Sequence, residues 1–365
     1  MTNSATLTSW LLNYLPDHVA LPDRGAVDGG VRLEPVSGDA GFRSYYRVNT
    51  QPTLIAVNAP PETENNPDFV RKGLAFSQAG VHSPKIYAVD YRAGFLLLED
   101  LGERVFLSEL KENPRALVYP PGLETLLQIQ RIPPLQRESS AQPIFADYSA
   151  EIFDREMQLF PQWFVEQLLG LSLQSDESAL LQATFDTLST SALSQPQVVV
   201  HRDFQIRNLL LLDNGGVGVI DYQDALIGPI TYDLVSLLRD CYIHLSDAQI
   251  DHYLDDYLNR ATAHYGEMSG GGLEPLPDST KFRRDFDLMG LQRHIKVLGI
   301  FARLHLRDNK PSYLAELPLF IRYVLEVAER YPETQPFRHW FGERVLPELA
   351  QQDWYANWET AGERE

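Results

Sequence analysis

The stretch Val198-Val-Val-His-Arg-Asp-Phe-Gln-Ile-Arg-Asn208 places a histidine, Asp203 and Asn208 at the spacing HxDxxxxN, directly after a short apolar strand. A second apolar stretch, Val217–Ile220, follows and ends in Asp221. Phosphoryl transfer uses these residue types in this order. The carboxylate of Asp203 can accept the proton of an attacking hydroxyl, and oxygens from Asn208 and Asp221 are the hard ligands that Mg²⁺ prefers. The pattern therefore predicts a phosphotransferase loop.

The chain around this loop changes from strand to helix near Gly102. Before that residue, runs of β-branched and aromatic residues predict strands at Val31–Ser37, Phe42–Asn49, Thr53–Ala59, Lys85–Tyr91 and Phe95–Glu99, with a helix at Pro67–Ala79. After it, helices are predicted at Leu107–Leu110, Pro121–Ile129, Tyr148–Leu169, Tyr232–Ile243, Asp285–Leu306 and Tyr313–Tyr331, interrupted by short strands at Val198–Val200, Leu209–Leu212 and Val217–Ile220. We therefore expect an α+β protein with a small β-rich lobe at residues 1–101, which includes a leading helix, and a larger helical lobe at residues 102–365.

Composition limits the possible partners. The chain has 365 residues and a net charge of −19, from 31 Lys and Arg against 50 Asp and Glu. Such a balance disfavours binding to nucleic acid or to an anionic membrane surface. The single cysteine, Cys241, excludes an internal disulfide framework. Because neither a signal peptide nor a membrane-spanning run is recognisable, we expect a cytoplasmic protein.

The catalytic stretch also supports a family resemblance. HRDFQIRN followed by VIDYQDALIGPITYDLVSLLRDCY resembles the aminoglycoside phosphotransferase superfamily, whose members share the protein-kinase-like fold. Within it, the chain is most similar to the bacterial N-acetylmuramate/N-acetylglucosamine anomeric kinases of cell-wall recycling. Further matching stretches are Gly38–Arg47, Asn58–Pro61, Gly94–Gly102 and Leu291–Leu304. The resemblance implies a two-lobe kinase fold, ATP and Mg²⁺ as cofactors, and a monomer that phosphorylates the anomeric hydroxyl of a small sugar to a sugar 1-phosphate in peptidoglycan recycling.

The same resemblance assigns roles to individual residues. Asp203 is expected to be the catalytic base, with Asn208 and Asp221 as magnesium ligands. The residues expected to bind the nucleotide are Gly38, Asp39, Ala40 and Gly41 in a phosphate-covering turn, Glu99 and Leu101 in a connector that pairs with adenine, and Arg43 and Asn58.

One feature departs from the protein-kinase pattern. Protein kinases carry a phosphate-binding lysine on the third strand, but the third predicted strand here, Thr53–Asn58, contains none. Either Asn58 occupies that position, or Arg43 or Arg47 supplies the positive charge. Each of these arginines can equally be a solvated strand residue.

Several polar residues near the catalytic loop and on the late helices are candidates for binding the acceptor. They are His201, Arg202, Gln223, Asp224, Arg239, Asp240, Arg293 and His294. For each of them, loop bracing or a salt bridge is the ordinary structural alternative, and bracing is the role we favour for His201. The resemblance gives Asp233 a bracing role as well. The five tryptophans could stack on a sugar, although packing in the core is their commoner use.

Three other functions remain open at this point. The acceptor could be an aminoglycoside, a choline-like amine or an amino alcohol, which an acidic protein would suit. The missing lysine could instead mark a pseudokinase-like nucleotide sensor, although the complete set of Asp203, Asn208 and Asp221 argues against it. A protein kinase is disfavoured because no Ala-Pro-Glu segment follows Asp221.

Overall fold

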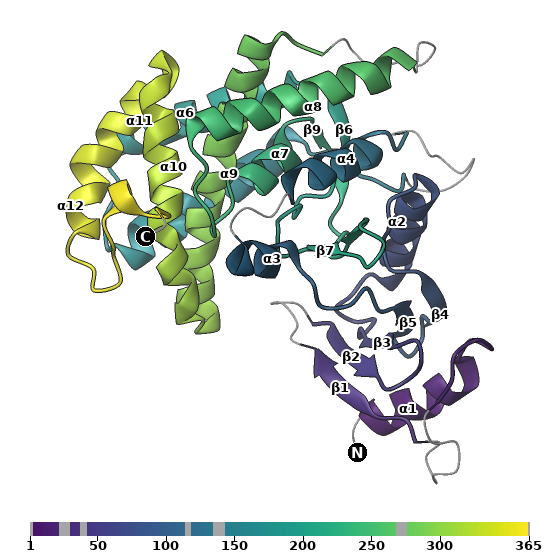
Figure 1. Cartoon of the computed structure of the whole chain (residues 1–365). Helices are drawn as coiled ribbons and strands as arrows, with labels where there is room; N and C mark the ends of the chain where they lie inside the picture. Colours follow the sequence, from purple (N-terminus) through teal and green to yellow (C-terminus); the bar gives the residue numbers. More distant parts are fainter. Residues whose placement is uncertain are drawn as a thin grey trace. The chain divides into compact units, whose positions relative to one another are not determined.

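The computed structural model describes residues 3–21, 30–36, 42–113, 118–133, 143–267 and 276–363, and it divides the chain into two compact units (Figure 1). Unit 1 combines Met1–Ala116, Leu135–Ile144 and Arg207–Ala225, and unit 2 combines Leu117–Pro134, Phe145–Ile206 and Leu226–Glu365. The segment that carries Asn208 and Asp221 therefore packs with the N-terminal part of the chain. The lobe boundary expected between residues 101 and 102 stays a prediction.

Unit 1 is built on a five-stranded antiparallel sheet with the strand order β1-β2-β3-β5-β4. The strands are β1 (Leu33–Val36), β2 (Ser44–Val48), β3 (Leu54–Asn58), β4 (Ile86–Asp90) and β5 (Phe95–Glu99). Strands β3 and β5 are interior strands, which explains why β5 is a nearly continuous apolar run. Helix α1 (Asn3–Tyr14) packs on the sheet through Leu7, Trp10 and Leu11. Trp10 thus has a core position beside Phe95.

Two further parts of unit 1 support the candidate metal ligands. Helix α2 (Asn66–Gln78) begins where the Asn65 side chain accepts a hydrogen bond from the backbone of Asp68, with Pro67 in its first turn. The strands β7 (Leu209–Leu211) and β8 (Val217–Val219) form a hairpin. Isolated bridges join this hairpin to His82 and Val105, and α3 (Phe106–Glu112) follows the second of them.

Unit 2 is mainly helical. Its α-helices are α4 (Tyr119–Gln130), α5 (Ala150–Met157), α6 (Ser175–Leu193), α7 (Tyr232–Leu238), α8 (Asp247–Glu267), α9 (Ser279–Asp308), α10 (Leu317–Arg330), α11 (Gln335–Trp340) and α12 (Leu346–Leu349). Two segments are π-helical, η1 (Phe160–Leu168) and η4 (Phe341–Val345). Three are 3₁₀-helical, η2 (Pro311–Glu316), η3 (Pro332–Thr334) and η5 (Trp358–Thr360). Strands β6 (Gln197–Val200) and β9 (Leu226–Pro229) pair antiparallel. Most of α9 is buried, so this helix forms the centre of the unit.

The predicted elements agree with the structure except where local chemistry intervenes. The helix expected at Tyr232–Ile243 ends at Leu238, because the Asp240 carboxylate accepts the backbone N–H groups of Tyr242 and Ile243 in a turn. The helix expected at Tyr148–Leu169 is two segments, α5 and the π-helical η1, and Pro161 lies in the first turn of the second. Helices α6, α8, α11 and α12 and strand β9 lie outside the elements predicted from the sequence.

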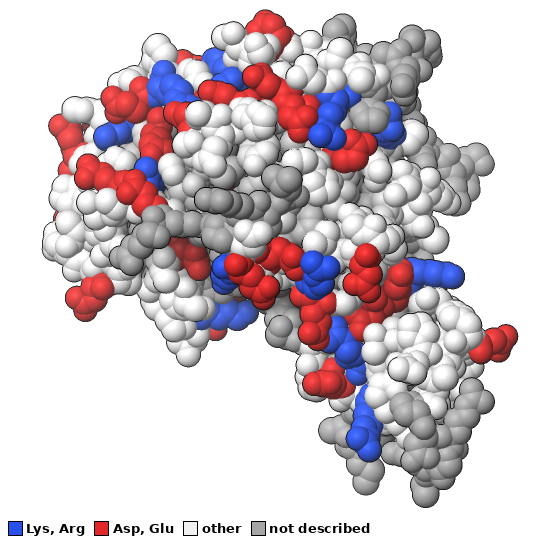
Figure 2. All heavy atoms as spheres, in the orientation of Figure 1, with Lys and Arg blue, Asp and Glu red and all other residues white. Residues whose placement is uncertain are grey.

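Figure 2 shows acidic and basic side chains interspersed over the face that it draws, with no extended basic area on it. Within the described part of the chain, the helices are all too short or too polar to span a membrane.

Candidate active site

The loop that carries Asp203 is held in unit 2 by a buried carboxylate. Asp233, in the first turn of α7, accepts hydrogen bonds from the backbone N–H groups of His201 at 2.6 Å and Arg202 at 3.0 Å. Arg202 has a φ of 76°, a left-handed conformation that costs energy in any residue with a side chain. The expected bracing role of Asp233 is thus confirmed, since it holds two consecutive N–H groups of a strained turn.

The side chain of Arg202 points into a buried charged cluster. Its guanidinium lies 2.5 Å from the Glu156 carboxylate and over the ring of Tyr148. Lys296 of α9 contacts the other oxygen of Glu156 at 2.9 Å. The two cations offset the desolvation of Glu156 and hold its pKa below the usual value, although burial alone would raise it. Glu156 is therefore ionised and anchors the loop to α5 and α9.

Asp203 faces a second cation from α9. Arg293 lies 3.7 Å from the Asp203 carboxylate, and it also donates to the Arg202 carbonyl at 2.9 Å and to the Tyr232 hydroxyl at 3.0 Å. Burial raises the pKa of Asp203, but Arg293, Lys296 and Arg202 outweigh this effect and lower it. About two fifths of the Asp203 side chain is exposed, at 42%. It is therefore an ionised carboxylate within reach of a bound molecule.

The candidate metal ligands lie together in unit 1, at the open end of the β7–β8 hairpin. The backbone N–H of Ile220 donates to the Asn208 carbonyl at 3.1 Å, and the Asn208 amide nitrogen lies 3.4 Å from the Asp221 carboxylate. Asp221 has a φ of 67°, so it too adopts the left-handed conformation. An amide and a carboxylate side by side fit Mg²⁺, which commonly takes one or two protein oxygens and completes its shell with phosphates and water.

The backbone that follows Asp221 rests on α2. Gln223 donates from its side chain to the Asp221 carboxylate at 2.6 Å, and Tyr222 stacks on Phe69 with ring centres 4.9 Å apart. The Lys72 ammonium donates to the Gln223 carbonyl at 2.6 Å. Lys72 is absent from the residues predicted from the sequence, because the only signal it offers is a position four residues after Asp68 on a helix.

The candidate nucleotide residues have the following surroundings in unit 1. Gly38, Asp39, Ala40 and Gly41 lie outside the described residues. Arg43 pairs with Glu64 at 2.9 Å and lies over the Phe69 ring, and Arg47 pairs with Asp100 at 2.6 Å.

Asn58 ends β3 opposite Ser44 and Phe95. The Glu99 carboxylate contacts the His82 ring, and the Leu101 side chain packs so closely on Gly218 that an added Cβ there would lie 2.8 Å from it. The nucleotide-binding roles of these residues stay predictions.

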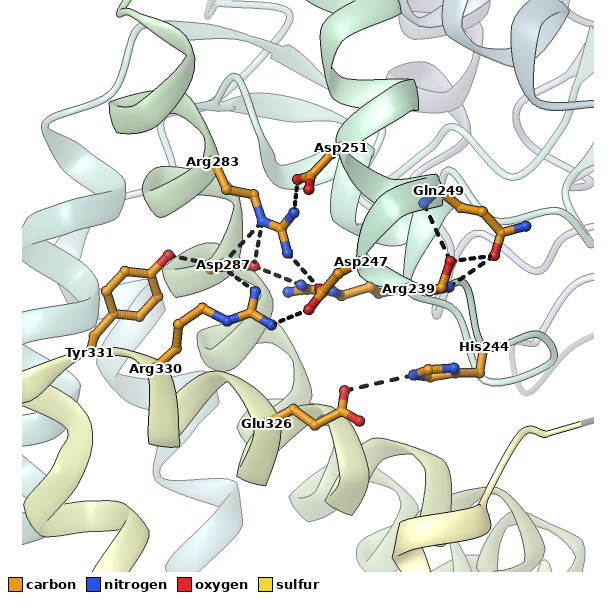
Figure 3. A network of polar contacts seen from close by, with 11 residues as sticks. Arg239, His244, Asp247, Gln249, Asp251, Arg283, Asp287, Glu326, Arg330 and Tyr331 are labelled. Atoms are coloured by element: carbon orange, nitrogen blue, oxygen red, sulfur yellow. Dashed lines mark hydrogen bonds and ion pairs between the residues drawn. The ribbon is translucent and has the colours of Figure 1, made fainter.

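The candidate acceptor residues of unit 2 have internal partners. The His201 ring is fully buried and accepts the Asp203 N–H, at 3.3 Å. Arg239 pairs with Asp287 at 2.6 Å, as Figure 3 shows, and Asp240 forms the turn after α7. His294 is fully buried and stacks on a tyrosine of α10. These partners account for the four residues structurally, and their contact with an acceptor stays a prediction.

The antiparallel five-stranded sheet, the helical unit and the HxDxxxxN loop define the class of the molecule, a two-lobe kinase-like phosphotransferase. The model of the phosphotransferase enzyme family matches residues 32–270, and the chain belongs to this family. The predicted fold class and superfamily are thereby confirmed.

Relatives with assigned names agree with this assignment. The chain is 38% identical over 329 residues to the N-acetylmuramate/N-acetylglucosamine kinase of Pseudomonas aeruginosa, covering 90% of this chain and 92% of that one. It is 38% identical over 339 residues to the protein of the same name from Neisseria meningitidis, covering 92% and 94%. Among solved structures, choline kinase from Cryptosporidium parvum superposes with a TM-score of 0.61 over 93% of this chain and 99% of that one. Its sequence identity of 12% makes this a likeness of fold alone.

Proposed function

We propose that this enzyme transfers the γ-phosphate of ATP to the anomeric hydroxyl of N-acetylmuramate or N-acetylglucosamine and releases the sugar 1-phosphate, in peptidoglycan recycling. The observation that carries the proposal is the 38% identity, over nine tenths of the chain, to enzymes named as kinases of these two sugars. The order of the loop residues in this sequence, Asp203, Asn208 and Asp221, supplies the groups that the reaction needs.

Each group has one task in the proposed mechanism. Asp203, which is ionised and partly exposed, accepts the proton of the sugar hydroxyl as its oxygen bonds to the γ-phosphorus and the bond to the β-phosphate breaks. Asn208 and Asp221 would hold Mg²⁺, which neutralises phosphate charge when bound. Asp233 and Glu156 keep the loop rigid, so that the Asp203 carboxylate is positioned before the substrate binds.

The acidity of the acceptor favours the anomeric hydroxyl. It is more acidic than the hydroxyl at C6, and a carboxylate of low pKa is a weak base. Such a base removes a proton more readily from the more acidic alcohol. We also propose that the enzyme acts as a monomer and that its acceptor is a small sugar.

The nature of the product tests the proposal directly. The enzyme is incubated with ATP, Mg²⁺ and either sugar, and phosphorus and proton NMR spectra are recorded before and after mild acid. We expect an acid-labile phosphate that couples to the anomeric proton, and no product in excess chelator. An acid-stable product coupled to the C6 protons would contradict the anomeric assignment. Turnover of choline or an aminoglycoside, with neither sugar phosphorylated, would contradict the substrate class.

Removal of the base tests the role of Asp203. We expect Asp203→Ala to lower kcat about 10²–10⁴-fold, because the hydroxyl proton then has no positioned acceptor. The affinity for the nucleotide, measured by calorimetry, should change far less. Asp213→Ala, at an exposed turn of the β7–β8 hairpin, is the matched control and should keep normal turnover. Normal turnover by folded Asp203→Ala would exclude it as the base.

A further inference from the structure

The third strand of the sheet does not supply the cation that protein kinases use. Strand β3 reads Leu-Ile-Ala-Val-Asn and contains no basic residue. Arg43 and Arg47, the two cations on or beside the neighbouring strand, are paired with carboxylates, at 2.9 Å to Glu64 and 2.6 Å to Asp100. Their charge is therefore already balanced within unit 1. The cation that contacts the backbone after Asp221 lies on helix α2 instead.

That cation is Lys72, on the inner face of α2. Its side chain is 9% exposed, and its ammonium lies 2.6 Å from the Gln223 carbonyl and 2.9 Å from the Asp68 carboxylate. A buried ammonium is costly unless it is both paired and hydrogen-bonded, and Lys72 meets both conditions. Burial raises the pKa of Asp68, but its hydrogen bonds with Lys72 and Arg71 outweigh burial and lower it, so Asp68 is an ionised partner for the ammonium. Lys72 thus donates a charge-assisted hydrogen bond to the carbonyl of Gln223, two residues after the candidate metal ligand Asp221.

The same short segment is held at further points by α2. Tyr222 packs between Phe69 and Phe76, with ring centres 4.9 and 5.5 Å away. Gly73 allows this close approach, since a Cβ at that position would lie only 2.6 Å from the Tyr222 hydroxyl oxygen. Residues 69, 72, 73 and 76 lie on one helical face, so α2 presents a continuous surface to the segment.

Gln223 connects Lys72 to Asp221, the candidate metal ligand. The Gln223 side chain donates to the Asp221 carboxylate at 2.6 Å, while its carbonyl accepts from Lys72. Asp221 has a φ of 67°, and a residue with a Cβ keeps such a conformation only where its surroundings impose it. The Gln223 amide, whose backbone Lys72 holds, therefore orients the Asp221 carboxylate together with the Asn208 amide at 3.4 Å.

We propose that Lys72 is a positioning residue for the metal site, which fixes the Gln223 carbonyl and thereby the strained backbone that orients the Asp221 carboxylate. It replaces the absent third-strand lysine by acting through the protein and not on the nucleotide phosphates. The inference rests on the proposed function in one respect, the assignment of Asp221 as a metal ligand.

The Mg²⁺ dependence of nucleotide binding distinguishes these two modes of action. Binding of ADP to the full chain is measured by calorimetry with excess Mg²⁺ and with excess EDTA, for wild type, Lys72→Met and the control Arg71→Met. Arg71 also pairs with Asp68, at 2.8 Å, so its replacement tests the loss of that pair alone. We expect Lys72→Met to weaken binding about ten- to a hundredfold in Mg²⁺, the range for a hydrogen bond with a charged partner, and to leave binding in EDTA unchanged. Arg71→Met should behave as wild type in both conditions.

Other outcomes would overturn the inference. Equal weakening of ADP binding in Mg²⁺ and in EDTA would mean that Lys72 contacts the nucleotide itself. Unchanged binding in both would mean that the Lys72 contact has no part in the metal site.

If Lys72→Met fails to fold, as judged by circular dichroism, Gln223→Leu provides the second test. This variant removes the donor to Asp221 and keeps the backbone carbonyl, and we expect the same Mg²⁺-specific loss. Unchanged Mg²⁺-dependent binding in Gln223→Leu would overturn the inference.

Asp221→Ala, which removes both candidate ligand oxygens, separates failure of this inference from failure of the proposed function. If it keeps full Mg²⁺-dependent binding, the assignment of the metal ligand is wrong. If it loses that binding while Lys72→Met and Gln223→Leu do not, only the role of Lys72 is wrong.

Discussion

At the scale of single residues, the site depends on which charges face Asp203. From α9, Arg293 and Lys296 lower the pKa of its carboxyl, and from its own loop Arg202 and His201 act in the same direction. Asp233 of α7 is the acidic neighbour, and burial raises its pKa to about 7, although the backbone N–H groups of His201 and Arg202 act against this rise. The cations dominate, so the carboxylate is ionised at neutral pH and its pKa lies below the ordinary value of about 3.9.

Replacing Arg293 should therefore change the acid side of the pH profile. A lowered pKa keeps the base unprotonated as the pH falls, so kcat/KM of the wild type should show no acid limb from Asp203 above about pH 4. In Arg293→Met, we expect that limb to move upward by about one pH unit or more, as for loss of an opposite charge within 4–6 Å. Arg307→Met, at an exposed position of the same helix, is the control. A limb that does not move would show that Arg293 does not govern the charge of Asp203.

At the scale of elements, the position of α9 decides which residues reach the loop. Gly299 lies against the turn between α5 and η1, where an added Cβ would come within 2.4–2.6 Å of the backbone of Leu159 and Phe160. Backbone atoms in a packed core cannot move aside as the end of a flexible side chain can. The close approach of these helices places Lys296 and Arg293, about one and two turns earlier in α9, beside α5 and the catalytic loop.

Gly299→Ala tests this close approach. In an exposed helix, Gly→Ala would stabilise by about 1 kcal/mol. Here we expect a net loss of about 1–3 kcal/mol in the free energy of unfolding, measured with urea, because the methyl group overpacks the contact. Gly290→Ala is the comparison in the same helix, where the nearest atom is the end of the Arg239 side chain at 3.1 Å, and it should cost less. A stabilised Gly299→Ala would contradict the packing argument.

At the scale of the whole molecule, a buried charge network ties the helices of unit 2 together. Asp287 of α9 is completely buried and contacts Arg239 after α7, Arg283 of α9 and Arg330 of α10, while Tyr331 donates to it at 2.8 Å (Figure 3). Burial alone would raise the pKa of Asp287, but the three arginines outweigh burial and lower it to about 2. The network also includes Asp247 of α8, which pairs with Arg283 and Arg330.

This network predicts a pH-dependent stability. The lowered pKa means that the charged form of Asp287 stabilises the folded state fully above about pH 4, and that this contribution declines as the pH falls toward 2. Asp287→Asn should cost about 3–5 kcal/mol at neutral pH, because Arg239 is left buried without its charge partner. Urea unfolding at pH 7, 5 and 3 should show the difference between wild type and variant shrinking at pH 3. A difference independent of pH would contradict this account, and Asp247, present in both proteins, cancels in the comparison.

The sequence by itself determined the features that depend on neighbouring residues. These are the spacing of Asp203, Asn208 and Asp221, the alternation of short strands and turns, and the resemblance to a phosphotransferase superfamily. Such features can be read directly from the chain because a strand or a loop motif is written in consecutive residues. Where the local pattern was weak, as in the Ser- and Thr-rich helix α6, the prediction failed.

Only the tertiary structure decided which distant side chains reach the site. Lys72 contacts a carbonyl 151 positions later in the chain, and Arg293 contacts one 91 positions earlier. Nothing in the spacing of a lysine on a helix indicates which buried carbonyl it will meet, because that choice depends on how the helix packs. The strained conformations of Arg202 and Asp221 also depend on the tertiary structure, since a residue with a Cβ keeps a left-handed φ only when surrounding contacts hold it there.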